Sequence, residues 1–201
     1  MSLLKFFLLA LLLYLSPSQR TADAREKDTV TVVITTELGN IEVGLYAKKA
    51  PITVQNFLRY VDSGFYNGGI FHRTVKLDNQ PGKNVLIEVI QAGINPDSAR
   101  RAESFSPIPL ERTNKTGLHH RNGTISMARD TPNSATSDFF ICIGDQPSLD
   151  YGGKRNPDGQ GFAAFGRVVK GMDVAKKIQT SSVDGQKLTP PVRILEIKRK
   201  F

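Results

Sequence analysis

The sequence predicts a mainly β fold, a closed antiparallel barrel capped by two α-helices. Strand-like runs recur along most of the 201 residues, and loops rich in glycine, proline and asparagine separate them. Only two segments of the mature part have the periodicity of an amphipathic helix. We expect the sheet to close on itself, because closure removes exposed strand edges that would pair with other chains. A chain of this length forms one domain with a sizeable core.

The first 24 residues differ from the rest of the chain. Lys5 precedes the unbroken apolar run 6–15, "FFLLALLLYL", and the triplet "ADA" at 22–24 offers a small-residue cleavage pattern. The run is too short to cross a bilayer, which takes about 20 apolar residues. We therefore expect a signal peptide over 1–24 and an exported mature domain over 25–201, periplasmic or secreted, without a membrane segment. An uncleaved anchor or a buried amphipathic start is the alternative.

The first elements after this leader are a hairpin and a helix. From residue 29 to 46 apolar and polar residues alternate, and Leu38-Gly39-Asn40 interrupts the alternation, which indicates two half-buried strands. Pro51 suits a first helical turn and Gly64 suits the position just past a helix end. Between them, apolar residues fall at the helical spacing i, i+3, i+4 and i+7, namely Val54, Phe57, Leu58 and Val61.

The rest of the chain returns to strands. A second short helix is expected over 172–179, where Val174, Ala175 and Ile178 share one face. No internal repeat, low-complexity tract or linker interrupts the sequence. Strand-like segments lie at 70–75, 85–91, 123–128, 138–143, 161–169 and 192–198.

Composition restricts the possible partners. The formal net charge is +8, and it becomes +7 without the leader, which contains Lys5, Arg20 and Asp23. The basic residues are scattered and form neither a helical stripe nor a nucleic-acid-binding signature, so we expect no nucleic-acid partner. The single cysteine, Cys142, excludes an intrachain disulfide and lies in an apolar run, where a buried filler is favoured over a nucleophile.

The common catalytic and metal-binding motifs are missing. The sequence contains no GxSxG, Walker or HExxH motif and no paired cysteines, so we expect no metal and no cofactor. His119 and His120 lie in a polar stretch beside Arg121, and a solvated loop is favoured over a metal site because the ligand spacing is unusual. Several short blocks instead mix apolar surface with one or two hydrogen-bonding groups, as a peptide-binding surface does.

These blocks resemble the cyclophilins, a family of peptidyl-prolyl cis-trans isomerases. They follow the family pattern in its order from about residue 29 to the end, and together they are far more specific than any one of them. The leader and the long segment "LDNQPGKNVLIE" make the bacterial secreted branch the most similar. The resemblance implies an eight-stranded antiparallel barrel with a helix closing each end. The blocks are "NFLRYVDSGFYNGGIFHRTV", "VIQAG", "GTISMAR", "SDFFICIGDQPSLD" and "FAAFGRVVKGMDVAKKI".

The resemblance also implies roles for individual residues. Arg73 matches the catalytic arginine of the family, and Gln91 matches a glutamine that binds the substrate backbone and helps to fix the arginine. Phe140 would form the floor of a proline pocket, and either Phe139 or Phe140 belongs to the core because strand neighbours face opposite ways. We interpret His72 as more structural than chemical, since the reaction needs no general base. The remaining substrate-binding positions are His72, Val89, Ala128, Leu149 and Phe162.

Several positions depart from the family pattern. Glu88 replaces a phenylalanine, Ser148 replaces the tryptophan of cyclosporin-sensitive members, and Phe162 replaces a histidine. The pair Arg129-Asp130 replaces two small neutral residues. We expect the proline pocket to be kept and its rim to be changed.

Two functions therefore fit the sequence. The first is an isomerase, acting as a monomer without a cofactor, that accelerates X–Pro rotation in unfolded or flexible exported polypeptides by stabilising the twisted amide. The second is a proline-peptide-binding module or chaperone with little turnover, which Glu88 favours most. A basic envelope-adhesion protein would explain the charge and none of the motifs.

Overall fold

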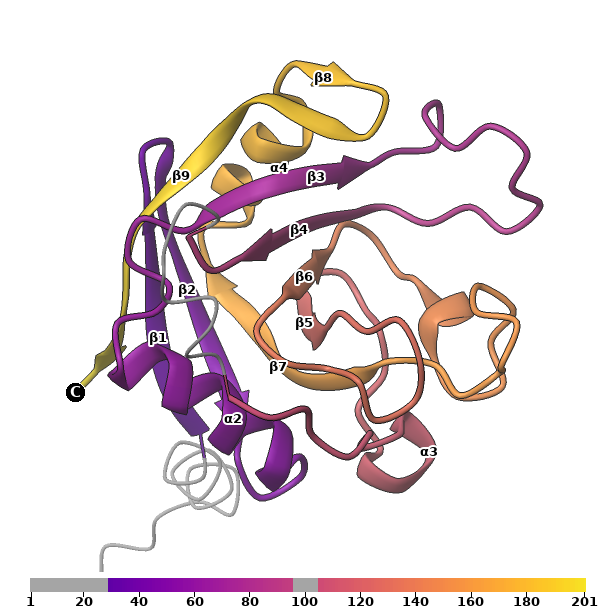
Figure 1. The fold of residues 1–201 in the computed structure, drawn as a ribbon, viewed down its shortest axis with the longest axis horizontal. Helices are drawn as coiled ribbons and strands as arrows, with labels where there is room; N and C mark the ends of the chain where they lie inside the picture. The colour runs from indigo at the N-terminus through magenta and orange to yellow at the C-terminus, as the bar shows by residue number, and fades with distance from the viewer. Residues whose placement is uncertain (1–28, 96–104) are drawn as a thin grey trace, which may run out of the picture.

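The computed structural model describes residues 29–95 and 105–201, and the predicted signal peptide lies outside them. Eight antiparallel strands form a closed barrel in the order β1-β2-β7-β5-β6-β4-β3-β9, and pairing of β1 with β9 closes it (Figure 1). A ninth short strand, β8, pairs only with β9. The bounds are β1 Thr29–Thr36, β2 Gly39–Tyr46, β3 Ile70–Val75, β4 Val89–Gly93, β5 Thr124–Met127, β6 Phe139–Cys142, β7 Ala163–Lys170, β8 Val183–Asp184 and β9 Lys187–Lys200. The predicted fold class is confirmed.

The predicted hairpin is present as β1 and β2. Its register places Val32 opposite Val43 and Ile34 opposite Ile41, and all four side chains are fully buried. Alternate residues of each strand therefore face the barrel interior, as the sequence pattern predicts. Gly39 allows the tight turn because its φ of 129° lies in a region that favours glycine.

Both predicted helices are present, and the described residues contain a third. Helix α2 (Pro51–Asp62) lies near β9, β2 and β7, whereas α4 (Met172–Gln179) lies near β2, β3 and β4 (Figure 1). The sequence did not indicate α3 (Thr113–Thr116) or the 3-10 turn η2 (Pro147–Leu149). Segments of three or four residues are too short to show a helical period.

Two predicted strand boundaries are wrong. The strand expected over 85–91 begins only at Val89, because the preceding residues belong to a long connection, 76–88, that extends away from the barrel (Figure 1). In this connection the side-chain amide of Gln80 donates to the Ile87 carbonyl and accepts from the Ile87 N–H. These two hydrogen bonds take the place of those that a neighbouring strand would make. The last strand is longer than expected and spans Lys187–Lys200, so that β8 has a partner.

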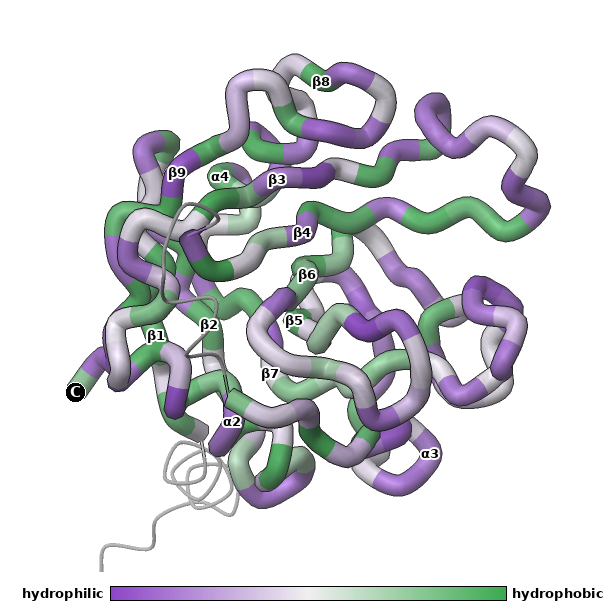
Figure 2. Tube along the Cα trace, viewed as in Figure 1, coloured by the Kyte–Doolittle hydropathy of each residue, from purple (hydrophilic) through white to green (hydrophobic). Residues whose placement is uncertain are grey.

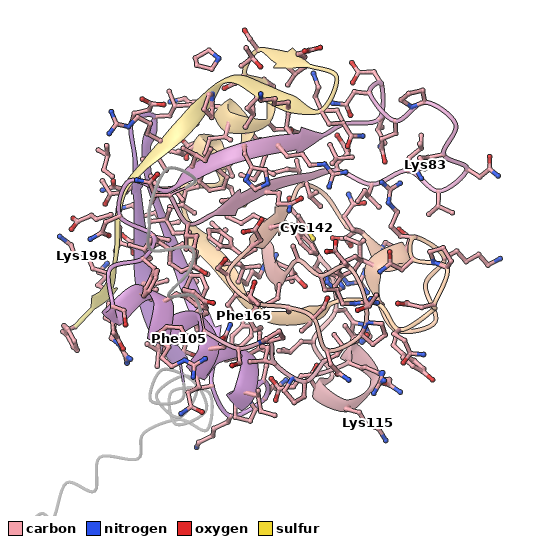
Figure 3. The ribbon with its side chains drawn as sticks, viewed as in Figure 1. Lys83, Phe105, Lys115, Cys142, Phe165 and Lys198 are labelled. Carbon is pink, nitrogen blue, oxygen red and sulfur yellow. The ribbon has the colours of Figure 1, made fainter. Side chains whose placement is uncertain are left out.

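Apolar residues divide into a large core and a small second cluster. The large core fills the barrel and includes Phe57, Phe139 and Phe165, whereas polar residues concentrate in the loops (Figure 2). The second cluster includes Cys142, which is labelled in the middle of the molecule in Figure 3, while Lys83 is labelled out on the 76–88 connection. Burial raises the pKa of the Cys142 thiol, which confirms the prediction of an inert filler. The second cluster consists of Val75, Ile87, Val89, Phe140, Cys142 and Leu149, with Ala128 and Phe162 packed against it.

Among residues 29–95 and 105–201, no helix is long and apolar enough to cross a membrane.

Candidate active site

A groove of about 750 Å³ opens over the second cluster. Its walls come from β3, β4 and β6, from the connection 76–88, and from the loops 128–138 and 149–162. The fold therefore brings together residues that lie far apart in the sequence. The groove is lined by seven of the eight predicted site residues: Arg73, Val89, Gln91, Ala128, Phe140, Leu149 and Phe162.

The pairing of β3 with β4 places Arg73 beside Gln91. The two residues are register partners, and Arg73 Nη1 donates to Gln91 Oε1 at 3.0 Å. The expected contact between the arginine and the glutamine is therefore present. Gln91 in turn lies opposite Phe140 on β6, so that the guanidinium and the apolar floor are held by three adjacent strands.

A second glutamine holds the other side of the guanidinium. Gln186, in the turn between β8 and β9, accepts from Arg73 Nε at 3.0 Å and from Nη2 at 2.6 Å. Its own amide donates to the Asn79 carbonyl at 2.9 Å, which fixes its orientation. The sequence analysis missed Gln186, because a single polar residue in a short turn gives no signal that it faces a distant strand.

The acceptors around Arg73 are neutral, and so the positive charge of the guanidinium is not cancelled. Burial lowers the pKa of Arg73 and the nearby Arg155 lowers it further, yet an arginine stays protonated at neutral pH. A guanidinium has five N–H groups, and the two glutamines use three of them. Two N–H groups remain without a protein partner in the described residues, on a side chain that lines the groove.

The floor of the groove is the ring of Phe140, which is only 4% exposed. Phe162 meets it edge-on at a centroid distance of 5.4 Å, and Val89 and Leu149 complete the apolar wall. Phe139 faces the opposite way and belongs to the large core. The prediction that only one of the two phenylalanines faces away from the core is confirmed.

His72 is the one predicted site residue that does not line the groove. A bulge in β3 between Phe71 and Arg73 shifts the register with both neighbouring strands. The bulge turns Arg73 toward the groove, while His72 Nε2 lies 3.8 Å from Asp138 Oδ2. Asp138 lines the groove and His72 itself does not, so His72 is adjacent to the site without forming its wall, in line with its interpretation as a structural residue.

The family assignment rests on sequence relatives. The cyclophilin type peptidyl-prolyl cis-trans isomerase/CLD family matches residues 31–199. Peptidyl-prolyl cis-trans isomerase A of Dickeya dadantii is 46% identical over 156 residues, covering 76% of this chain and 74% of that protein. Peptidyl-prolyl cis-trans isomerase B of Escherichia coli is 38% identical over 149 residues, covering 74% of this chain and 83% of that protein. The chain belongs to the cyclophilin family.

Solved structures agree with the fold of this cyclophilin. The crystal structure of a Cryptosporidium parvum cyclophilin type isomerase superposes with a TM-score of 0.68, covering 86% of this chain and 98% of that chain. The two sequences are 23% identical, so this likeness concerns the fold alone. The enzymatic class, peptidyl-prolyl cis-trans isomerase, follows from the family and its bacterial relatives.

The departures of this cyclophilin from the family pattern divide into two groups: Phe162, Arg129 and Asp130 line the groove, whereas Glu88 and Ser148 do not. Glu88 points to α4, where its carboxylate accepts from Gln179 Nε2 at 3.0 Å, and Ile87 lines the groove. Ser148 is not among the lining residues. The Arg129 side chain is 1% exposed and donates to Asp158, so its charge is compensated beside Phe162.

One sequence interpretation of this cyclophilin is wrong. His119 is exposed as expected, but His120 is not part of a solvated loop: it is 1% exposed and fully packed. Its backbone carbonyl accepts from the Gln146 N–H, and its ring lies under Phe140. The polar neighbours along the chain concealed this burial, because the partners of His120 come from distant elements.

Proposed function

We propose that this cyclophilin accelerates X–Pro rotation in unfolded or flexible exported polypeptides by stabilising the twisted amide without covalent chemistry. The observation that carries the proposal is the state of Arg73. Its guanidinium lines the groove, is fixed on two sides by glutamine oxygens, and keeps two N–H groups for a substrate.

The chemistry of the X–Pro bond explains why such a group is useful. Amide resonance gives peptide rotation a barrier of about 18–20 kcal/mol. In the planar amide the proline nitrogen shares its lone pair and accepts no hydrogen bond, but in the twisted amide the lone pair returns to the nitrogen. A donor placed at this nitrogen therefore binds the transition state better than either planar isomer, and this preference lowers the barrier.

The magnitude shows that Arg73 acts together with the groove. An acceleration of about 10⁵ requires about 7 kcal/mol of transition-state preference. Two hydrogen bonds from a charged donor contribute about 1.5–3 kcal/mol each. The remainder is assigned to the groove, which removes water from the amide and strengthens the field of the guanidinium.

The apolar floor supports a proline ligand. A proline ring is compact and apolar, and it fits against Phe140 with Val89 and Leu149 at its sides. Ala128 has a short side chain, so the substrate backbone can approach closely there. One solved relative, from Cryptosporidium parvum, is described as crystallised in the presence of the dipeptide Ala-Pro, which is in line with this proposal.

The structure weakens the alternative of a binding module with little turnover. Glu88 was the sequence feature that favoured it, and the Glu88 carboxylate bonds Gln179 of α4 rather than lining the groove. A protein-folding assay tests the substrate class: refolding of a protein limited by prolyl isomerisation should become faster. Acceleration of a short Ala-Pro peptide with no effect on refolding would exclude unfolded chains as substrates.

We also propose that the chain is exported after cleavage behind Ala24 and acts as a monomer. The apolar run 6–15 and the "ADA" triplet support export. N-terminal sequencing of protein from the cell envelope should give a first residue of Arg25. An intact Met1 in cytosolic protein would contradict export, and a dimer in analytical ultracentrifugation would contradict the monomer.

A further inference from the structure

The buried imidazole of His120 lies between a carboxylate and a hydroxyl, and its two ring nitrogens bond one each. Its Nδ1 lies 2.6 Å from Asp150 Oδ1, and its Nε2 lies 3.0 Å from Ser126 Oγ. The same carboxylate oxygen accepts from the His120 backbone N–H at 3.0 Å, and the other oxygen bonds His119 Nδ1 at 2.8 Å. Asp150 thus holds the histidine by both its backbone and its ring.

The order of donors and acceptors in this chain follows from the chemistry of its groups. Hydrogen bonds from the two histidines outweigh the effect of burial and lower the pKa of Asp150, so the carboxylate is ionised and can only accept. His120 Nδ1 therefore carries a hydrogen, and Nε2 of the neutral ring accepts from the Ser126 hydroxyl. This order, with the Ser126 hydroxyl as donor to Nε2, requires a neutral imidazole.

Hydrolytic chemistry does not explain this chain of residues. A nucleophilic serine has to reach its substrate, but Ser126 is fully buried and is not among the residues lining the groove. What the network does reach is the floor of the groove. The imidazole ring stacks on Phe140 with a centroid distance of 5.9 Å and an interplanar angle of 16°.

Phe140 is thereby held from two directions. Phe162 contacts it edge-on, and His120 stacks against it with a nearly parallel ring. A ring that stands in two hydrogen bonds cannot rotate or slide as a leucine or methionine could. The fixed imidazole therefore restricts the orientation of the Phe140 ring that stacks on it.

We propose that His120 is a positioning residue of this isomerase: its neutral ring, held between Asp150 and Ser126, fixes the Phe140 floor on which the substrate proline rests. The proposal rests on the proposed function of the groove. It predicts that protonation of His120 weakens catalysis, because Nε2 becomes a donor and the Ser126 hydroxyl must turn to another acceptor.

The direction of the pH effect follows from the groups that face His120. Burial lowers the pKa of His120, the hydrogen bond to Asp150 raises it in part, and His119 lowers it slightly. Phe140 and Ser126, the other groups in contact with the ring, carry no charge. The imidazole is therefore neutral at neutral pH and takes up a proton only below about 6.5, the ordinary value for histidine.

Exchange NMR on an Ala-Pro peptide between pH 5 and 7.5 tests the proposal. The catalysed flip rate of the wild type should decline with acid below pH 6.5, by about two- to tenfold once His120 is fully protonated, which corresponds to the loss of one hydrogen bond. In His120→Asn the rate should already be lower at pH 7.5 and should no longer change with pH. A variant that keeps the wild-type rate and the same acid decline would overturn the proposal.

The chain has three histidines, so the other two provide matched controls. His119→Asn changes a ligand of the same carboxylate that has no ring contact with Phe140, and it should keep both the neutral-pH rate and the acid decline. His72→Asn should also keep the acid decline. If either control variant loses the acid decline, the decline belongs to that histidine and the role of His120 is refuted.

Ser126→Ala covers the case in which His120→Asn does not fold. Removal of the hydroxyl takes a donor from the neutral imidazole, so the nitrogen-15 titration of His120 and the acid decline should both move to higher pH. An unchanged midpoint would contradict the network. Because wild-type turnover at pH 7.5 is measured in the same series, failure of the isomerase assignment is distinguished from failure of the His120 proposal.

Discussion

Replacement of Gln186 by leucine tests whether catalysis depends on how Arg73 is held. The substitution keeps a side chain of similar length and removes the oxygen that accepts from Arg73 Nε and Nη2. Among the described residues, Gln91 remains as the single acceptor on the guanidinium, at Nη1. The side chain stays charged and stays in the groove, but it can rotate about its single remaining contact.

The expected loss of turnover in Gln186→Leu is large, although Gln186 has no direct role in the reaction. A hydrogen bond to a charged group contributes about 1.5–3 kcal/mol, and water replaces part of what is lost in this half-exposed groove. If the equivalent of one such bond is lost in the transition state, turnover falls roughly 10- to 150-fold. The dissociation constant of a short Ala-Pro peptide should change less than about threefold, because the planar ground state makes little use of the arginine.

Exchange NMR measures the flip rate and the bound fraction in one sample. Gln160→Leu is the matched control, since Gln160 also accepts from an arginine, Arg112, but does not line the groove. The control should retain wild-type turnover. Gln186→Leu with a wild-type flip rate and an intact amide spectrum would refute the argument that the orientation of Arg73 limits catalysis.

Three further predictions concern the groove and its support. Cyclosporin should bind weakly, because Ser148 lacks an indole N–H and a broad apolar face, and isothermal titration showing the affinity of a tryptophan-containing relative would contradict this. The free energy of unfolding should fall as the pH drops below about 6.5, because the unfolded chain protonates His120 there whereas burial lowers the pKa in the folded chain. Urea denaturation at several pH values checks this by comparison with His120→Asn, whose curve should fall less. Phe140→Ala should weaken peptide binding and turnover together through lost apolar surface, and a loss of turnover alone would show that the ring is not the pocket floor.

The sequence predicts the fold well where the residue pattern and the structure have the same period. Alternation predicts the hairpin of β1 and β2, and i, i+3, i+4 spacing predicts α2 and α4. Local pattern fails in the connection 76–88, whose apolar Ile87 resembles a strand residue but is held by the Gln80 side chain. The residue pattern cannot reveal that the Gln80 side chain, and not a neighbouring strand, satisfies the backbone hydrogen bonds of Ile87.

The site was predicted from local blocks, and its omissions come from long-range contacts. Arg73 and Gln91 lie within recognisable motifs, and their strands are adjacent. Gln186 is 113 residues from Arg73 in sequence and lies in a turn without a motif. His120 was misassigned for the same reason, since Asp150 lies 30 residues away and supplies the partner that allows a polar ring to be buried.

The central claim is that Arg73 acts on the twisted amide, and Arg73→Ala tests it most directly. Exchange NMR on an Ala-Pro peptide should show a flip rate lowered at least about 100-fold, the scale of two lost charge-assisted hydrogen bonds of about 1.5–3 kcal/mol each, with the bound fraction nearly unchanged. Arg73→Lys should restore little, because a compact ammonium lacks the planar fork that Gln91 and Gln186 hold. If Arg73→Ala keeps most of the wild-type flip rate in an intact fold, the arginine is not the catalytic donor.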